Sequence, residues 1–196
     1  MKIVGLITEY NPFHNGHLYH IQKAKEISGA DAAVVVMSGN YVQRGAPAIM
    51  PKHLRAEVAL EAGVPVVMEL PVCYASGSAE YFAAGAISLF EQLGCIDSIC
   101  FGSECGDYKV LERIARVTAD EPEEYKFSLQ EALRKGISFP RARQMALKAY
   151  LKDDSLDVIL EQPNNILGIE YIKALYKKKS SIKNLYHQTH GIRLPR

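Results

Sequence analysis

Four short apolar runs, separated by segments of helical periodicity, occupy the first half of the chain and constrain its fold more than any other feature. The runs span residues 3–7, 32–37, 64–70 and 96–101. They are rich in Val and Ile and lack polar alternation, which is typical of strands buried on both faces of a parallel sheet. Strands that alternate with helices connect through right-handed crossovers. The sequence therefore predicts an α/β fold, a Rossmann-like doubly wound parallel sheet.

Gly and Pro mark the ends of the helices between these runs. The first helix ends at Gly29, the next begins after Pro51 and ends at Gly63, and the third ends at Gly94. The second half of the chain is mainly helical, with candidate helices over residues 108–117, 125–135, 140–151 and 165–178.

Three loops follow the predicted strands on the side where open α/β sheets bind their ligands, beyond the carboxyl ends of the strands. They span residues 8–17, 38–51 and 102–107. Because the carboxyl ends of parallel strands meet at one edge of the sheet, we expect these loops to converge on a single crevice.

The first loop carries the motif His14-Asn15-Gly16-His17. Asn15 is a good N-cap for the helix that follows. The backbone N–H groups of Gly16, His17 and Leu18 then lack helical partners and form an anion site. Gly16 lets a phosphate approach the backbone closely, and the two imidazoles can stabilise charge that develops on it. The motif is the H-x-G-H signature of the nucleotidyltransferase superfamily, and it predicts attack on the α-phosphate of ATP to form an adenylate.

The spacing of His14, His17 and His20 leaves a metal site as an alternative. Pro12 and the expected cap place His14 outside the helix, so the three rings do not share one helical face, and Glu9 is the only carboxylate nearby. We therefore expect no protein-bound metal, and a structural role for His20 stays open.

Basic residues outside the motif are candidates for contact with the triphosphate or with RNA. The formal net charge is only +1, so any attraction to a polyanion must be local. Arg44 and Lys52 lie in or next to the second loop, and Lys177, Lys178 and Lys179 lie in a basic C-terminal stretch. Alternatively, each of these residues is a solvated surface charge without a binding role.

Longer motifs resemble those of the bacterial tRNA-Met cytidine acetate ligase family, a branch of the HxGH nucleotidyltransferases. They are G-L-I-T-E-Y-N-P-F-H-N-G-H at 5–17, M-S-G-N at 37–40, Q-R-G at 43–45, F-G-S-E at 101–104 and P-N-N-I-L-G at 163–168. The resemblance runs from the start of the chain to about Ser181. It implies an HxGH nucleotidyltransferase fold over residues 1–183, with its helical extension, followed by an unassigned tail over 184–196.

The resemblance also implies a two-step reaction. ATP and acetate give acetyl-adenylate, and the acetyl group then passes to the wobble cytidine of elongator tRNA-Met, giving N4-acetylcytidine. Mg²⁺ is expected with the triphosphate, and His14 and His17 are the expected catalytic residues. By motif, the residues expected to bind ATP are Ile7, Thr8, Glu9, Tyr10, Asn11, Pro12, Phe13, His14, Asn15, Gly16, His17, Leu18, Tyr19, His20, Gly102 and Asn165.

Two other functions stay open. One is a metabolite nucleotidyltransferase that uses no acetate. The other is a truncated, non-catalytic nucleotide- or RNA-binding domain, because the superfamily's second signature, I-S-S-T-x-x-R, is not found. No apolar run reaches the roughly 20 residues of a membrane span, and the polar N-terminus does not resemble a signal peptide. We expect a cytoplasmic protein without membrane contact, and the oligomeric state is left open.

Overall fold

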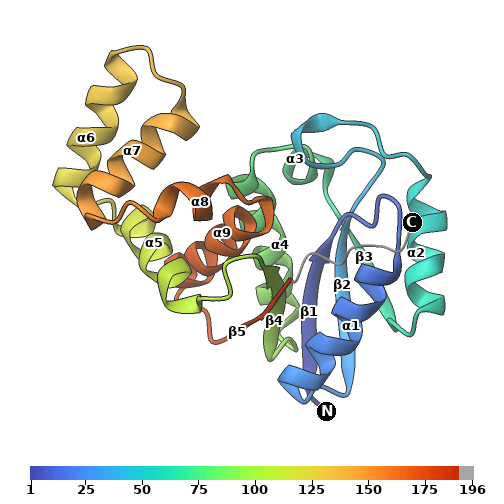
Figure 1. Cartoon of the computed structure of the whole chain (residues 1–196). Coiled ribbons are helices and arrows are strands. Elements are labelled where there is room, and N and C mark those ends of the chain that lie inside the picture. Colours follow the sequence, from blue (N-terminus) through green and yellow to red (C-terminus); the bar gives the residue numbers. More distant parts are fainter. Residues whose placement is uncertain (190–196) are drawn as a thin grey trace.

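A five-stranded parallel sheet forms the centre of the molecule, with the strand order β3-β2-β1-β4-β5 (Figure 1). The computed structural model describes residues 1–189. The strands are β1 (Ile3–Thr8), β2 (Ala32–Ser38), β3 (Val66–Leu70), β4 (Ser98–Ser103) and β5 (Lys183–Gln188). The order reverses between β1 and β4, which makes this the point where a ligand crevice is expected. The predicted doubly wound α/β fold is confirmed.

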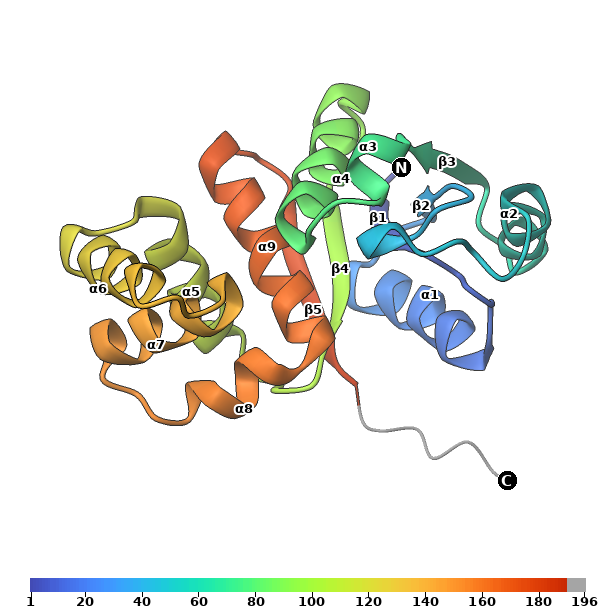
Figure 2. The same ribbon diagram turned by 90° about the horizontal axis from the view of Figure 1, so that it is seen from above.

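Helices cover both faces of the sheet (Figure 2). They are α1 (Asn15–Ser28), α2 (Lys52–Glu61), α3 (Val72–Ala75), α4 (Ala79–Leu93), α5 (Tyr108–Asp120), α6 (Glu123–Arg134), α7 (Phe139–Leu151), α8 (Leu156–Glu161) and α9 (Pro163–Lys178), with a 3-10 turn η1 (Gln43–Gly45). Alternate strand residues face two separate cores. Val4 and Leu6 pack toward α1 and α2, whereas Ile99 and Phe101 pack toward α4 and α9.

The helical second half is built around α9, which packs against α4 and α5. The pair α6 and α7 stands away from the sheet (Figure 1). No helix within residues 1–189 is both long enough and apolar enough to cross a bilayer.

The sequence missed the fifth strand. Its residues, Lys183–Gln188, pair in parallel with β4 along its whole length, so the sheet continues beyond the expected boundary at residue 183. Only one residue of this strand, His187, is buried. A polar edge strand gives little of the hydrophobic pattern on which the prediction relied. Residues 190–196 of the expected tail lie outside the described residues.

Gly168 sets the distance between α9 and the sheet. A Cβ atom at this position would lie 2.5 Å from Cε2 of Phe101, which is itself buried. We expect Gly168→Ala to lower the free energy of unfolding by about 1–3 kcal/mol, because the helix or the ring must shift. Urea denaturation tests this, and the double variant with Phe101→Leu should recover part of the loss. Equal losses in the single and double variants would contradict the packing argument.

Candidate functional site

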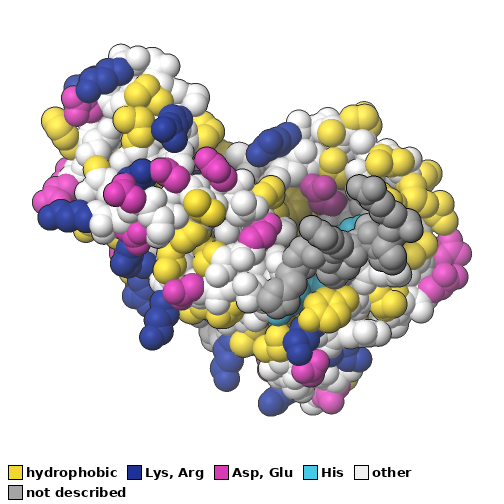
Figure 3. Space-filling model, in the orientation of Figure 1, with side chains coloured by type: hydrophobic (Ala, Val, Ile, Leu, Met, Phe, Trp, Pro, Cys, Tyr) yellow, Lys and Arg dark blue, Asp and Glu magenta, His cyan; other side chains and the backbone are white. Residues whose placement is uncertain are grey.

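A cavity of about 760 Å³ opens where the strand order reverses. It is bounded by the carboxyl ends of β1 and β4, the first turns of α1 and α9, and the end of β5. Figure 3 shows histidine side chains beside the hollow at the centre of this face.

The predicted ATP residues divide into those that line the cavity and those that support it. The lining residues are Ile7, Thr8, Glu9, His14, Gly16, His17, Tyr19, His20 and Gly102. The others lie behind or beside the wall: Tyr10, Asn11, Pro12, Phe13, Asn15, Leu18 and Asn165. Gln43, Asn164, Leu167 and Tyr171 also line the cavity and were not predicted.

His14, not Asn15, caps helix α1. Its Nδ1 accepts a hydrogen bond from the Gly16 N–H at 3.1 Å, and its carbonyl accepts from the N–H groups of His17 at 2.8 Å and Leu18 at 3.3 Å. The expected row of free amides is therefore wrong: the imidazole occupies the place that an Asn side chain would take at a cap. Gly16 is needed for the same reason, because a Cβ atom there would lie 2.9 Å from Cε1 of His14.

The two motif histidines stack on each other with ring centroids 3.8 Å apart. His17 Nδ1 accepts a hydrogen bond from the His14 backbone N–H at 3.3 Å, which completes a reciprocal capping box. Because each Nδ1 accepts a hydrogen bond, the N–H that each ring has left to donate is the one on Nε2. Nε2–H is thus the donor that each ring can offer to a ligand in the cavity.

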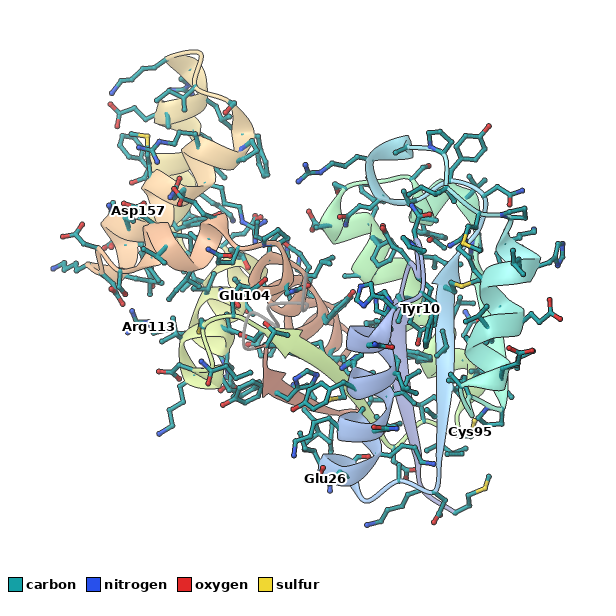
Figure 4. The ribbon with its side chains drawn as sticks, turned by 45° about the vertical axis from the view of Figure 1, so that its right-hand side comes forward. Tyr10, Glu26, Cys95, Glu104, Arg113 and Asp157 are labelled. Carbon is teal, nitrogen blue, oxygen red and sulfur yellow. The ribbon has the colours of Figure 1, made fainter. Side chains whose placement is uncertain are left out.

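Aromatic side chains hold the His17 ring from behind. Tyr10 is fully buried, and its ring lies 4.9 Å from that of His17 and 4.8 Å from that of Phe13. Figure 4 shows Tyr10 between β1 and the start of α1. Burial, followed by the charge of His14, lowers the pKa of His17 from its ordinary value near 6.5 to about 4. His17 is therefore neutral at physiological pH. The hydrogen bond that its Nδ1 accepts fixes the tautomer, so the ring can donate to a phosphate oxygen from Nε2.

A second histidine pair lies deeper in the cavity. His20 Nδ1 is 2.6 Å from Nε2 of His187 on β5, and both residues line the cavity. Burial lowers the pKa of both rings, and the charge of His187 further lowers that of His20. The sequence gave no reason to pair these residues, because β5 was not predicted.

These depressed values predict a loss of stability in acid. A histidine whose pKa is lower in the folded protein than in the unfolded chain stabilises the fold above the unfolded value, near 6.5. This contribution is lost as the pH falls from about 6.5 toward the folded value of about 4 for His17. We expect the urea midpoint to fall across this window, with NMR titration showing a neutral His17 ring at pH 5.5. Titration of that ring near pH 6.5 would contradict the burial argument.

Buried Arg55 joins the first and second loops. Its side chain is 1% exposed, and its guanidinium donates to the carbonyls of Glu9 and Gly39 and, at 3.1 Å, to that of Met50. The Gln43 N–H donates to Glu9 Oε1 at 2.9 Å. These bonds place Gln43 in the wall of the cavity next to the end of β1.

Asn165 organises the third loop from behind the cavity wall. Its Oδ1 accepts hydrogen bonds from Ser103 Oγ at 2.8 Å and from the N–H groups of Glu104 at 2.9 Å and Cys105 at 3.2 Å. Glu104, labelled in Figure 4, in turn accepts from the Asn165 N–H at 3.0 Å. Asn165 thus shapes the wall, and its neighbour Asn164 lines it.

The predicted basic residues do not gather in this cavity. Arg44 adopts a left-handed backbone conformation (φ 66°) and lines a separate cavity. Lys52 pairs with Glu69 at 2.5 Å. Lys177, Lys178 and Lys179 lie at or just beyond the far end of α9, about 20 Å along the helix from Asn164 at 1.5 Å per residue. Arg44 therefore does not line the ATP cavity, and its contact with phosphate or RNA stays a prediction.

Two polar side-chain atoms of the cavity lining are buried without a hydrogen-bond partner among the described residues. They are Gln43 Nε2 and Thr189 Oγ1. Unpaired buried polar groups cost about 1–3 kcal/mol each, so they point to a partner supplied from outside the protein. Within residues 1–189, no group of three or more His, Cys, Asp or Glu side chains is arranged to hold a metal ion.

The sequence of this chain is similar to those of known proteins. The profile of the family described as HIGH Nucleotidyl Transferase matches residues 1–189. The tRNA(Met) cytidine acetate ligase of Acetivibrio thermocellus is 55% identical over 183 residues, covering 93% of this chain and 44% of the relative. The ligase of Clostridium perfringens is 49% identical over 190 residues, covering 93% of this chain and 47% of the relative.

A solved structure is also similar. Thermotoga maritima TmcAL bound with alpha-thio ATP matches with a TM-score of 0.95 and 44% identity, covering 100% of this chain and 48% of that one. This chain therefore spans about half the length of the relatives it matches.

Proposed function

Because this chain belongs to the HIGH nucleotidyl transferase family, we propose that it binds ATP in the cavity between β1 and β4 and forms acetyl-adenylate there. The observation that carries the proposal is the stacked pair His14 and His17, with both Nδ1 atoms bonded to backbone N–H groups. This arrangement leaves two Nε2–H donors fixed beside a cavity large enough for a nucleotide.

In the first step, an acetate oxygen attacks the α-phosphorus while the bond to the bridging oxygen of the β-phosphate breaks, and pyrophosphate leaves. The chain's part is to hold the phosphates in line and to stabilise negative charge on the α-phosphate oxygens. His14 and His17 donate from Nε2. The Gly16 N–H, at the positive end of the α1 dipole, donates to Nδ1 of His14 and polarises the ring. This polarisation strengthens the hydrogen bond that Nε2 donates to the ligand.

In the second step, the exocyclic amine of the wobble cytidine of elongator tRNA-Met attacks the acetyl carbonyl, the acyl C–O bond to AMP breaks, and the amine loses a proton as AMP leaves. The base must leave its stack to reach the adenylate. The names of the relatives from A. thermocellus and C. perfringens support this substrate. We also propose a cytoplasmic location, where tRNA is modified.

Mg²⁺ is expected with the triphosphate, whose charge it would partly neutralise. Among the described residues, the cavity lining includes one carboxylate, that of Glu9, whose Oε1 already accepts a hydrogen bond from the Gln43 N–H. This donor set fits a hydrated cation carried in by ATP, and Glu9 is the residue that would meet it.

Acetate-dependent exchange of labelled pyrophosphate into ATP tests the proposal. Exchange that requires acetate supports adenylate formation. Exchange without acetate would indicate a metabolite nucleotidyltransferase, and ATP binding without exchange would indicate a non-catalytic domain. Incubation with ATP, acetate and unmodified tRNA-Met, followed by nucleoside mass analysis for N4-acetylcytidine, tests the second step.

A further inference from the structure

A second cavity, of about 770 Å³, lies next to the ATP cavity and is not used by the adenylation step. Adjacent residues of the same elements line the two cavities. Gln43 lines the first and Arg44 the second, and on α9 Leu167 lines the first and Ile166 the second. A ligand that extends out of the ATP cavity along η1 and α9 would therefore enter this one.

The second cavity is lined by three arginines: Arg44, Arg141 and Arg143. Arg44 and Arg141 are exposed and form no ion pair within residues 1–189; Arg141 bonds only the amide oxygen of Gln144, at 2.8 Å. Figure 3 shows basic side chains on both sides of the hollow between the α6–α7 pair and the sheet. The cavity thus presents two free guanidinium groups, which suit phosphate oxygens.

The acidic residues of this cavity are already neutralised. Glu170 is 1% exposed, with Oε1 2.6 Å from Arg143 Nη1 and Oε2 3.7 Å from Lys173 Nζ. Lys173 also pairs with Glu80 at 2.8 Å. Neither carboxylate oxygen of Glu170 accepts a hydrogen bond of good geometry from the described residues. Glu170 therefore holds Arg143 and Lys173 in place through the charge of its carboxylate.

An aromatic ring and a helix start complete the site. Phe139, the first residue of α7, lines the cavity and is 53% exposed, so its ring is open to stacking. The N-cap residue Ser138 makes no side-chain capping hydrogen bond. Pro140 has no backbone N–H and the Ala142 N–H bonds the Ser138 carbonyl, so the N–H groups of Phe139 and Arg141 are the ones in this turn that can meet an anion. An exposed ring beside unpaired arginines is the combination by which proteins bind single-stranded RNA.

We propose that this cavity binds the single-stranded RNA next to the acetylated cytidine, with a phosphate on Arg44 and Arg141 and an unstacked base on Phe139. The inference rests on the proposed function, because the RNA must reach the adenylate in the first cavity.

Binding of a fluorescent anticodon stem-loop of tRNA-Met, measured by anisotropy over a series of salt concentrations, tests the proposal. We expect Arg141→Gln to weaken binding about tenfold and to reduce the salt slope by about 0.7, the value for one phosphate contact on a single strand. Phe139→Ala should weaken binding about 5- to 150-fold, and Phe139→Tyr should restore it. Both residues are exposed, so the variants should keep the parent's melting temperature.

Matched controls are available on α6. Arg134→Gln removes an exposed arginine that forms no ion pair with any residue of the described range 1–189, and Phe127→Ala removes a ring that is 68% exposed but outside the cavity. Both should bind RNA like the parent. Equal binding by Arg141→Gln and Arg134→Gln, or a loss of ATP rather than RNA affinity, would overturn the proposal. Failure of the parent chain to bind the stem-loop would also overturn it. The acetate-dependent exchange reaction tests the adenylation proposal separately, because it needs no RNA.

Discussion

Replacement of His17 by Ala is expected to lower the rate of acetate-dependent pyrophosphate exchange by about 100- to 1,000-fold, the usual effect of losing one preorganised donor to a transition state. The His17 ring is neutral, stacked on His14 and supported by Tyr10, so its donor is aimed before the ligand arrives. ATP affinity should change much less than the rate, because the charge that the donor stabilises develops during the reaction. Initial rates of pyrophosphate exchange measure the first effect, and equilibrium binding of ATP measures the second.

Variants of His14 can separate a structural role from a catalytic one, because each role uses a different ring nitrogen. Nδ1 caps α1 by accepting from the Gly16 N–H, and Nε2 is the nitrogen left to donate to the ligand. Asn can accept the capping bond with its side-chain oxygen but has no group in the place of Nε2. His14→Asn should therefore keep the parent's stability and lose rate, whereas His14→Ala should also lose about 1 kcal/mol of stability. Equal activity of His14→Asn and the parent would rule out the donor role.

Replacement of Arg55 by Met is expected to lower the free energy of unfolding by about 3 kcal/mol, because three loop carbonyls lose a charged donor in a buried place. That is a large share of the roughly 5–15 kcal/mol that stabilises an ordinary domain. Arg55→Lys keeps the charge but not the planar fork, so it should recover only part of the loss. Urea denaturation gives the magnitudes.

The exposed Arg134 provides the control for Arg55. Arg134→Met removes an arginine that has no ion pair within residues 1–189, so it should change stability by less than about 0.5 kcal/mol. A similar loss in the two variants would mean that Arg55 does not join the loops. We also expect ATP affinity to fall in Arg55→Met but not in Arg134→Met, because Arg55 donates to the carbonyl of Glu9, which lines the ATP cavity.

The sequence predicted the layers of the fold because buried strands and helix ends leave local signals. Gly29 and Gly94 end α1 and α4 in left-handed conformations, as expected. The polar strand β5, which pairs with β4, and the short helices α3 and α8, which pack mainly on other helices, leave no such signal.

The candidate site was predicted in outline but not in its bonding. The H-x-G-H pattern located the cavity, yet the cap was assigned to Asn15, because N-cap preferences describe Asn and not an imidazole. No local pattern singles out Arg55, because only the folded structure brings the carbonyls of Glu9, Gly39 and Met50 around it. The pairing of His20 with His187 joins residues 167 positions apart in the sequence.

A crystal structure of this chain soaked with a non-hydrolysable ATP analogue examines the stacked histidines most directly. We expect an α-phosphate oxygen within about 2.7–3.2 Å of Nε2 of His14 or His17, with each Nδ1 still bonded to its backbone N–H. A triphosphate bound away from the first turn of α1, or imidazoles turned so that Nε2 faces the protein interior, would contradict the adenylation mechanism.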